Sequence, residues 1–373
     1  GSSMIAFHLP KKDFQGFHIV ASHSDSPTYR IKEQPEMSVE KHYTKLNIER
    51  YGGMIPETWF DRPLSVAGRI IIEENGQIKD QLVNIDRDLM IIPNLAIHMS
   101  RSSNESKQLN PQKDLLPLCG GNLTKDGFEE MIAKESGVEK EDILSYDLFL
   151  YNRMRGTTLG INEEFVAAPK LDDLECAYSS IEGMLNAKLS KDYVTVCAVF
   201  DNEEVGSGTK QGAGSTFFPE VLKRISYLCG KNEEEYYMAV ADSFMLSADN
   251  AHAVHPNYQD KTDPTNRPYI NEGIVLKYNA SQKYTTDANS AALVKYLCKK
   301  EKIKCQVFFN RSDMLGGSTL GNILTGQVSI KAADIGLPQL SMHSTYETAG
   351  CKDLDDMITL MGSFYELGKE VQI

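Results

Sequence analysis

The sequence predicts an α/β fold: a sheet covered by helices on both faces, interrupted by a mostly β insert. Two observations support this. Short apolar runs alternate with amphipathic stretches near the start of the chain and after Pro169, which is typical of strands with helices packed on both faces of their sheet. The region between them shows strand-like alternation and Gly-Gly turns instead. The 373 residues, 41% of them apolar, suffice for two domains.

The α/β part opens with the apolar run 17–22, which stops at the polar cluster 23–27, as a buried strand does where it enters a loop. After Pro169, periodicity predicts a helix over 173–188, a strand over 193–200 and a helix near 219–229. Further units are expected at 237–243, 290–301, 306–309 and 354–368, and the stretches 237–241 and 336–341 are interpreted as strands.

The insert has its own pattern. Strands are expected over 64–72, 82–85 and 89–92, and one helix over 125–136. We therefore predict a discontinuous α/β domain at residues 1–34 and 167–373, and an inserted β-rich domain at residues 35–166.

Charge and composition exclude several classes of protein. The formal net charge of −13 and the isoelectric point near 5.2 argue against nucleic-acid or acidic-lipid partners, because these require clustered Lys and Arg. The apolar runs are too short to cross a bilayer and no signal-peptide pattern opens the chain, so we expect a cytoplasmic protein. The seven cysteines are scattered without a C-x-x-C pair, which predicts free thiols.

Histidines and carboxylates gather where the expected strands end. In an open α/β sheet the loops at the carboxyl ends of the strands converge on one crevice, so clusters far apart in sequence can form one site. The clusters are His23 and Asp25 after the first run, Asp201, Glu203 and Glu204 after 194–200, Asp242 and Asp249 after 237–241, and His343 after 336–341.

This set matches the needs of two divalent cations. A pair of ions held a few ångströms apart needs one shared carboxylate, and each ion needs a further imidazole and carboxylate, with a water bridging the two ions. The assignments are Asp172 as the shared carboxylate, His23 with Asp249 for one ion, and Glu204 with His343 for the other.

Neighbouring residues receive supporting roles. Asp25 is placed to hold the free ring nitrogen of His23, and Asp173 to cap the following helix. Adjacent side chains diverge after a strand, so Glu203 and Glu204 are not expected to bind the same ion. With Glu204 assigned to a metal, Glu203 is free to act as the general acid/base that takes a proton from the bridging water.

Each of these residues also has an ordinary explanation: Glu203 and Glu204 as a solvated acidic pair, His23 as a core histidine, and Asp172 as a charge at a helix start. Only their joint placement after strands predicts a metal-dependent hydrolase, and no H-E-x-x-H motif strengthens it. The turn 315–319 fits a substrate contact and a helix start equally well.

Long strings of the sequence closely resemble the aspartyl aminopeptidase (aminopeptidase I) family of dinuclear zinc exopeptidases. They run nearly end to end: Ser-His-Ser-Asp-Ser-Pro at 22–27, Thr-Trp-Phe-Asp-Arg at 58–62, Asn-Leu-Ala-Ile-His at 94–98, Leu-Asp at 171–172, Asp-Asn-Glu-Glu-Val-Gly at 201–206, Ala-Asp-Asn-Ala-His-Ala-Val-His-Pro-Asn-Tyr at 248–258 and Gln-Leu-Ser-Met-His-Ser at 339–344.

The resemblance implies a mixed-sheet, zinc-exopeptidase-like domain acting on peptides with a free N-terminus. It implies the same ligands, His23, bridging Asp172, Glu204, Asp249 and His343, with Glu203 as general acid/base. The implied metals are two divalent ions per subunit, zinc first, with manganese or cobalt as alternatives.

Assembly is also implied by the resemblance. The insert would mediate dimers that build a tetrahedral dodecamer, and His98 would reach a neighbouring subunit's active site. The substrate-side positions would be His252, His255, Lys277, Gly317 and Ser318. The family carries a segment before the opening strand, so a preceding segment is expected, and at position 173 members often have Asn where this chain has Asp.

Two rival functions use the same residues. A dinuclear-metal deacylase or carboxypeptidase would keep the ligands and change only the substrate pocket. A non-enzymatic assembly or cargo protein would have no need of a base at Glu203. The preferred N-terminal residue is not legible in the sequence, and acidic selectivity is suggested by the family name alone.

Overall fold

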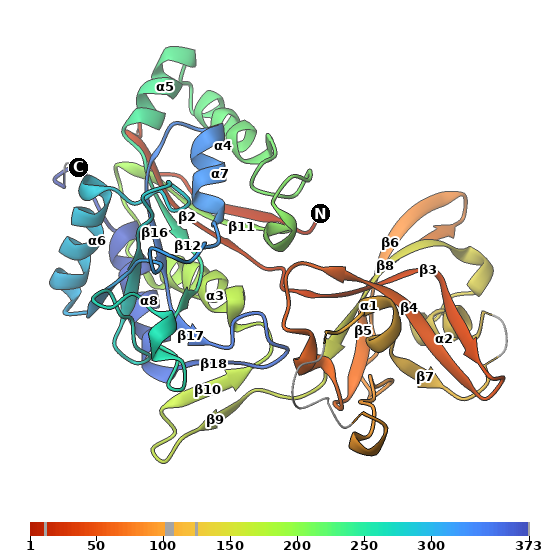
Figure 1. Ribbon diagram of the computed structural model, residues 1–373. Helices are drawn as coiled ribbons and strands as arrows, with labels where there is room; N and C mark the ends of the chain where they lie inside the picture. The colour runs from red at the N-terminus through yellow and green to blue at the C-terminus, as the bar shows by residue number, and fades with distance from the viewer. Residues whose placement is uncertain (11–12, 101–107, 124–125, 372–373) are drawn as a thin grey trace. The chain divides into compact units, whose positions relative to one another are not determined.

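The computed structural model describes the chain apart from residues 11–12, 101–107, 124–125 and 372–373. Figure 1 shows the fold, in which the chain forms two compact units. The first unit contains residues 1–26, 157–342 and 347–373, and the second contains residues 27–156 and 343–346. The predicted α/β class, with a mostly β insertion, is confirmed.

The first unit is built on a seven-stranded mixed sheet. In spatial order its strands are β1 (Met4–His8), β11 (Tyr193–Phe200), β2 (Gly16–His23), β12 (Phe244–Ala248), β16 (Lys331–Gly336), β14 (Ile274–Lys277) and β15 (Cys305–Phe308). The four central strands β11, β2, β12 and β16 are parallel, whereas β1 and β14 are antiparallel to their neighbours β11 and β16. All residues of β2 and β11 are buried, as expected for strands covered on both faces.

Helices cover both faces of this sheet (Figure 1). On one face α3 (Leu171–Asn186), α6 (Ala288–Glu301) and α8 (Cys351–Tyr365) share a core with Val20 and Leu246. On the other face α4 (Phe217–Leu228), α5 (Glu233–Ala241) and α7 (Leu320–Gln327) share a core with Ile19 and Met245. The side chains of successive strand residues therefore pack into the cores on opposite faces of the sheet. This is why the strands appear in the sequence as continuous apolar runs.

A smaller sheet completes the first unit. Its order is β13 (Ala251–His252), β17 (Pro338–Leu340), β18 (Glu347–Gly350), β10 (Phe165–Ala168) and β9 (Thr157–Leu159). It receives the chain directly after β12 and β16, because β13 and β17 follow these strands after short turns.

One predicted strand in this unit is wrong. Residues 237–241 form the end of helix α5, not a strand. The helix wins because Asn232 and Glu235 make a reciprocal capping box at its start and three glutamates occupy its first turn. The strand is β12, so Asp249 still follows a strand, whereas Asp242 ends α5 and precedes β12.

The second unit is a six-stranded antiparallel sheet. Its order is β6 (Gln77–Asn84), β5 (Leu64–Glu74), β8 (Ile143–Asn152), β3 (Thr28–Val39), β4 (Tyr43–Tyr51) and β7 (Leu118–Gly120), with α1 (Pro111–Asp114) and α2 (Gly127–Ser136). Trp59 and Leu148 belong to its core. The stretch 89–92, expected as a strand, makes isolated bridges only.

No helix in the described part of the chain is both long and apolar enough to span a membrane.

Candidate metal centre

His23 is the last residue of β2, at the carboxyl edge of the main sheet. It pairs in register with Phe200, the last residue of β11, so the loops after these two strands begin side by side. The imidazole is almost completely buried, and its Nε2 atom lies 3.7 Å from Oδ1 of Asp172.

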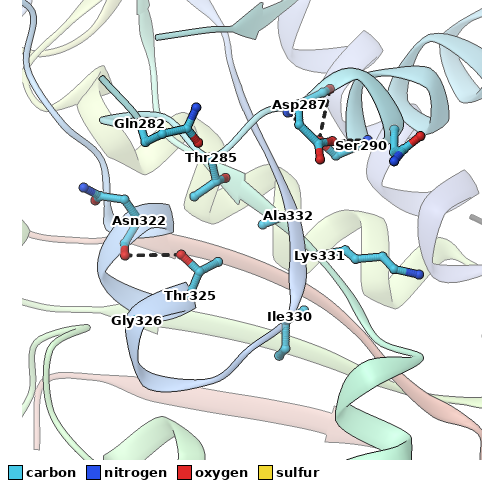
Figure 2. Close-up of a pocket in the computed structure, with 11 residues that line it drawn as sticks. Gln282, Thr285, Asp287, Ser290, Asn322, Thr325, Gly326, Ile330, Lys331 and Ala332 are labelled. Carbon is cyan, nitrogen blue, oxygen red and sulfur yellow. Dashed lines mark hydrogen bonds between the residues drawn. The ribbon is translucent and has the colours of Figure 1, made fainter. Parts of the chain in front are cut away.

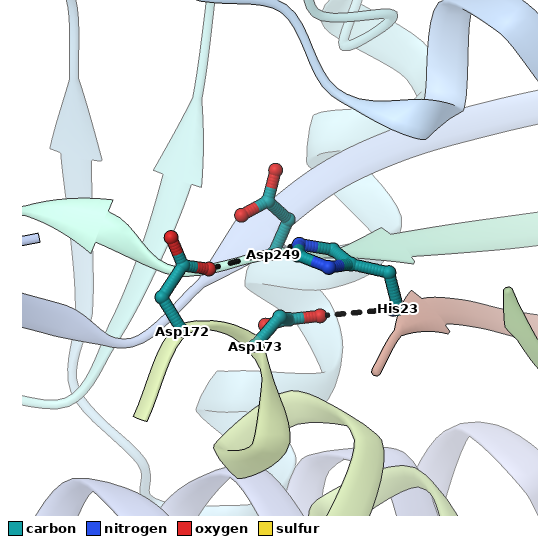
Figure 3. A group of neighbouring side chains, drawn as sticks. All are labelled: His23, Asp172, Asp173 and Asp249. Atoms are coloured by element: carbon teal, nitrogen blue, oxygen red, sulfur yellow. Dashed lines mark hydrogen bonds and ion pairs between the residues drawn. The ribbon is translucent and has the colours of Figure 1, made fainter. Parts of the chain in front are cut away.

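Three aspartates surround this imidazole (Figure 3). Asp172 and Asp173 come from the start of α3, and Asp249 comes from the loop after β12. One potential ligand atom from each of the four residues lies within 4.8 Å of the others. His23 and Asp249 converge because the parallel strands β2 and β12 end at the same edge of the main sheet. Asp172 and Asp173 reach the same point from the start of α3, which follows β10 of the smaller sheet.

Asp173 does not act as the predicted side-chain cap. The first turn of α3 has no side-chain cap hydrogen bond, and Oδ2 of Asp173 instead accepts from the backbone N–H of His23 at 3.2 Å. Oδ1 of Asp173 is buried and has no hydrogen-bond partner among the described residues. The side chain is therefore turned into the cluster, which a local helix-start signal could not indicate.

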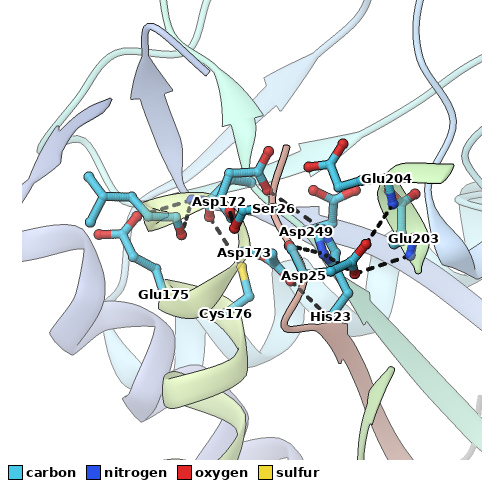
Figure 4. A network of polar contacts seen from close by, with 12 residues as sticks. His23, Asp25, Ser26, Asp172, Asp173, Glu175, Cys176, Glu203, Glu204 and Asp249 are labelled. Atoms are coloured by element: carbon cyan, nitrogen blue, oxygen red, sulfur yellow. Dashed lines mark hydrogen bonds and ion pairs between the residues drawn. The ribbon is translucent and has the colours of Figure 1, made fainter. Parts of the chain in front are cut away.

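Glu203 and Glu204 lie in the turn that follows β11, in the short 3-10 helix Glu203–Val205 (Figure 4). The carboxylate of Asp25 fixes this turn, because it accepts from the backbone N–H groups of both glutamates at 3.1 Å. A carboxylate oxygen of Glu204 lies within 4.8 Å of one of Asp172.

Asp25 also contacts His23, mainly through its backbone. Nδ1 of His23 is 3.1 Å from the carbonyl oxygen of Asp25 and 3.4 Å from its carboxylate. One residue therefore orients both the imidazole and the turn that carries the glutamates, which is how residues behind metal ligands generally work.

The acidic side chains perturb one another strongly. Burial, with a contribution from Asp249, raises the pKa of Glu203 to about 7. Burial and the neighbouring charge of Asp172 raise the pKa of Glu204 to about 10. Burial also raises the pKa values of Asp173 and Asp249.

The imidazole responds in the opposite sense. Burial alone would lower the pKa of His23, but the contact with Asp25 and the charges of Asp173 and Asp172 outweigh burial and raise it. These carboxyl groups have pKa values raised by burial and by one another's charge, and they gather around one imidazole, so a nearby positive charge would stabilise their ionised forms. Imidazole and carboxylate oxygen are ligands suited to zinc, so this donor set fits a divalent cation.

His343 belongs to the second unit, in the stretch 343–346. It follows Met342 of the first unit directly in the chain, and its backbone carbonyl accepts from the N–H of Ile55 at 3.1 Å. The ligand role predicted for His343 stays a prediction.

Several residues that the sequence analysis did not predict as site residues make hydrogen bonds that hold the cluster in place. Glu347 accepts from the backbone N–H of Asp172 at 3.0 Å, and the hydroxyl of Ser26 donates to the carbonyl of Asp172 at 2.9 Å. Asn250, next to Asp249, donates to the carbonyl of Leu171 and to Glu175. Ser26 and Asn250 lie next to predicted ligand segments, but Glu347 lies in β18 and carried no sequence signal.

The expected substrate-side residues separate into two groups. His252, His255 and Gly317 line a cavity of about 280 Å³ in the first unit, next to Ser318 in the chain. Lys277 is buried at the end of β14, where its Nζ atom donates to the backbone carbonyls of Asp249 and Asn250 and lies 3.7 Å from Oδ2 of Asp249. Its charge is therefore directed at the loop that carries Asp249 and Asn250.

His98 lies in the second unit, in the short 3-10 helix Ile97–Met99, and is exposed to solvent. Leu95, Ile97 and Met99 beside it are exposed as well. The role predicted for His98 in a neighbouring subunit's active site depends on an assembly of several chains, and it stays a prediction.

A larger cavity of the first unit lies elsewhere (Figure 2). It measures about 670 Å³, is lined mainly by hydroxyl and amide side chains such as Thr285, Asn322 and Thr325, and contains none of the clustered aspartates. Size alone therefore does not identify the site, whereas the gathering of perturbed carboxylates around His23 does.

The α/β fold and the cluster of His, Asp and Glu side chains fit the class of metal-dependent hydrolases. The family model described as Aminopeptidase I zinc metalloprotease (M18) matches residues 1–365. The chain belongs to this M18 family of aminopeptidases, as the sequence resemblance implied.

Individual relatives agree with this. The probable M18 family aminopeptidase 2 of Clostridium acetobutylicum is 46% identical over 379 residues, which cover 98% of this chain and 86% of the relative. A chain in the cryo-EM structure of the Ape4 and Nbr1 complex is 37% identical with a TM-score of 0.93, covering 98% of this chain and 74% of that one. The structure of the S. cerevisiae mApe1 dodecamer matches at 27% identity with a TM-score of 0.83, covering 97% of this chain and 83% of that one.

Proposed function

We propose that this protein removes the N-terminal residue from peptides with two divalent cations bound between His23, Asp172, Glu204, Asp249 and His343. The observation that carries the proposal is the convergence of ligand atoms of His23, Asp172 and Asp249 within 4.8 Å, with a carboxylate oxygen of Glu204 also within 4.8 Å of one of Asp172. Membership of the zinc metalloprotease family supports zinc as the metal, with manganese or cobalt as substitutes.

Asp172 is the proposed bridge because it is near both halves of the site. It lies beside His23 and Asp249 on one side and beside Glu204 on the other. Asp173 is the weaker candidate, since one of its oxygens already accepts from the backbone of His23.

When bound, the cations would polarise the scissile carbonyl and lower the pKa of an attacking water. Glu203 takes the proton of that water and returns it to the leaving amine. In the metal-free protein burial raises the pKa of Glu203 to about 7, and the positive charge of bound cations would lower it, which favours the ionised carboxylate that accepts the proton. Asp25 acts by holding the turn on which Glu203 and Glu204 stand.

The substrate approaches from the cavity lined by His252, His255 and Gly317 in this proposal, with Ser318 beside it and Lys277 steadying the loop of Asp249. In the same proposal the insert mediates dimers, and the dimers assemble into a tetrahedral dodecamer. The relative described as a dodecamer supports self-association. His98 then enters a neighbouring subunit's site and donates a hydrogen bond to the scissile carbonyl oxygen.

A panel of aminoacyl-arylamides, assayed with added zinc, manganese and cobalt, tests the function. Release of arylamine from unblocked substrates, and none from N-acetylated ones, is expected of an aminopeptidase, whereas cleavage of blocked substrates indicates the deacylase alternative. Metal analysis should give two ions per chain, and one ion or fewer would contradict the dinuclear site. Because Glu203 is present and its pKa is perturbed, we favour catalysis over a purely scaffolding role.

A further inference from the structure

A second polar cavity lies in the first unit at the amino edge of the main sheet. It measures about 420 Å³ and is lined by the starts of β2, β11, β12 and β16, together with residues that follow α8. His18 in this cavity and His23 in the metal cluster lie five positions apart in β2, which corresponds to roughly 17 Å along an extended strand. The cavity is thus distinct from the proposed active site.

Strand register builds one wall of the cavity. Phe244 pairs with His18 on one side and with Lys331 on the other, in three adjacent parallel strands. Directly paired residues of neighbouring strands project from the same face of a sheet, so imidazole, phenyl ring and ammonium form a row. The strand starts therefore fix the backbone positions of these three residues.

His18 has surroundings unlike those of an ordinary core residue. It is 4% exposed, and its ring stacks on that of Tyr193 with centroids 4.0 Å apart and planes 15° apart. Its Nδ1 atom has no hydrogen-bond partner among the described residues. Burial lowers the pKa of His18 to about 3, so the ring is neutral and offers one donor and one acceptor.

The other residues that line the cavity carry both positive and negative charges. Lys331 and Lys369 contribute ammonium groups, and Asp242 contributes a carboxylate that accepts from the hydroxyl of Tyr193 at 3.2 Å. Leu367 and Val371 add an apolar patch. A ligand complementary to this lining has a carboxylate, a positively charged donor and a small apolar group.

We propose that this cavity binds a free α-amino acid in its zwitterionic form. The carboxylate of the ligand pairs with Lys331 and Lys369, its ammonium group pairs with Asp242, and its side chain packs against Leu367 and Val371. An aminopeptidase releases ligands of this class, so the source of the amino acid rests on the proposed function, whereas the binding itself does not.

Titration calorimetry on metal-depleted protein tests the proposal with three probes of similar size: leucine, 4-methylpentanoate, which lacks the amine, and 3-methylbutylamine, which lacks the carboxylate. Leucine should bind at least tenfold more tightly than either of the other two. Equal affinity for all three, or no heat from leucine at millimolar concentration, would overturn the proposal.

Two variants locate the binding. Lys331→Met and Asp242→Asn should each weaken leucine binding at least tenfold, and Asn at 242 can still accept from Tyr193. The control is Lys299→Met, because Lys299 is an exposed lysine in the last turn of α6 outside the cavity. Unchanged affinity in both cavity variants would place the leucine elsewhere and refute the site.

The result is independent of the proposed catalysis. The metal-depleted protein turns over no substrate if the peptidase proposal holds, yet should still bind leucine in the cavity. If leucine binds but the metal-loaded protein has no arylamidase activity, only the peptidase proposal is contradicted. If the metal-loaded protein is active but leucine does not bind, only the amino-acid cavity is contradicted.

Discussion

Replacing Glu204 by glutamine tests whether burial and the charge of Asp172 raise the pKa of Glu204 in the metal-free protein. Burial and the charge of Asp172 raise the pKa of Glu204 from 4.5 to about 10, so at pH 7 the metal-free folded protein keeps a proton that the unfolded chain releases. For a carboxyl whose pKa is raised on folding, stability is fully present below pH 4.5 and decreases as pH rises towards 10.

The size of the effect follows from that window. Between pH 4.5 and pH 7, at about 1.36 kcal/mol per tenfold change in proton concentration, the cost of keeping Glu204 protonated reaches about 3.4 kcal/mol. Relaxation and water entry in a half-buried site reduce this, so we expect Glu204→Gln to raise the free energy of unfolding of the metal-free protein by about 1–3 kcal/mol at pH 7.

Urea unfolding of metal-depleted protein at pH 5 and pH 8 measures this directly. The gain from Glu204→Gln should be small at pH 5 and larger at pH 8, and adding zinc should stabilise the original protein more than the variant. Glu220→Gln, at an exposed position of α4, is the control. A gain that is absent, or that does not grow with pH, would show that Glu204 is not held protonated by its surroundings.

Three further changes probe the proposed mechanism. Glu203→Gln should keep two metals per chain and lower kcat by about 10²- to 10⁴-fold, because it removes proton transfer; near-normal turnover would exclude the role. Asp25→Ala should lower kcat by loosening the turn of both glutamates, with Asp25→Asn recovering part of the loss because one amide oxygen can still accept a backbone N–H; equal defects in the two variants would argue against positioning. His98→Ala should lower activity about a hundredfold or more, and mixing it with Glu203→Gln subunits under proven subunit exchange should restore some activity, since a mixed dimer can hold one intact site; if no activity returns, His98 is a structural histidine.

Much of the α/β unit could be predicted because its signals are local. Apolar periodicity marks β11 and places β2, α4, α6 and α8 to within a few residues at each end. The stretch 237–241 shows the limit. Its apolar residues suit a strand, but the capping box formed by Asn232 and Glu235 starts a helix that runs through it.

The candidate site was partly predictable for the same reason. His23 ends a strand, Glu203 and Glu204 lie in the turn after one, and Asp249 directly follows one, so a rule about strand ends is enough to bring them together. Asp242 was grouped with them only because the strand before it was misplaced, and it lies instead at the cavity on the amino edge of the sheet.

By itself, the sequence determined the class of fold, the family, and the residue types that gather at the carboxyl edge of the sheet. Only the tertiary structure decided that Asp173 turns into the cluster, that Glu347 holds the backbone of Asp172, and that Lys277 points at the carbonyls of Asp249 and Asn250. These contacts join segments between 27 and 175 residues apart. Local propensity and periodicity carry no information about them, because such contacts depend on strand order and register across the whole sheet.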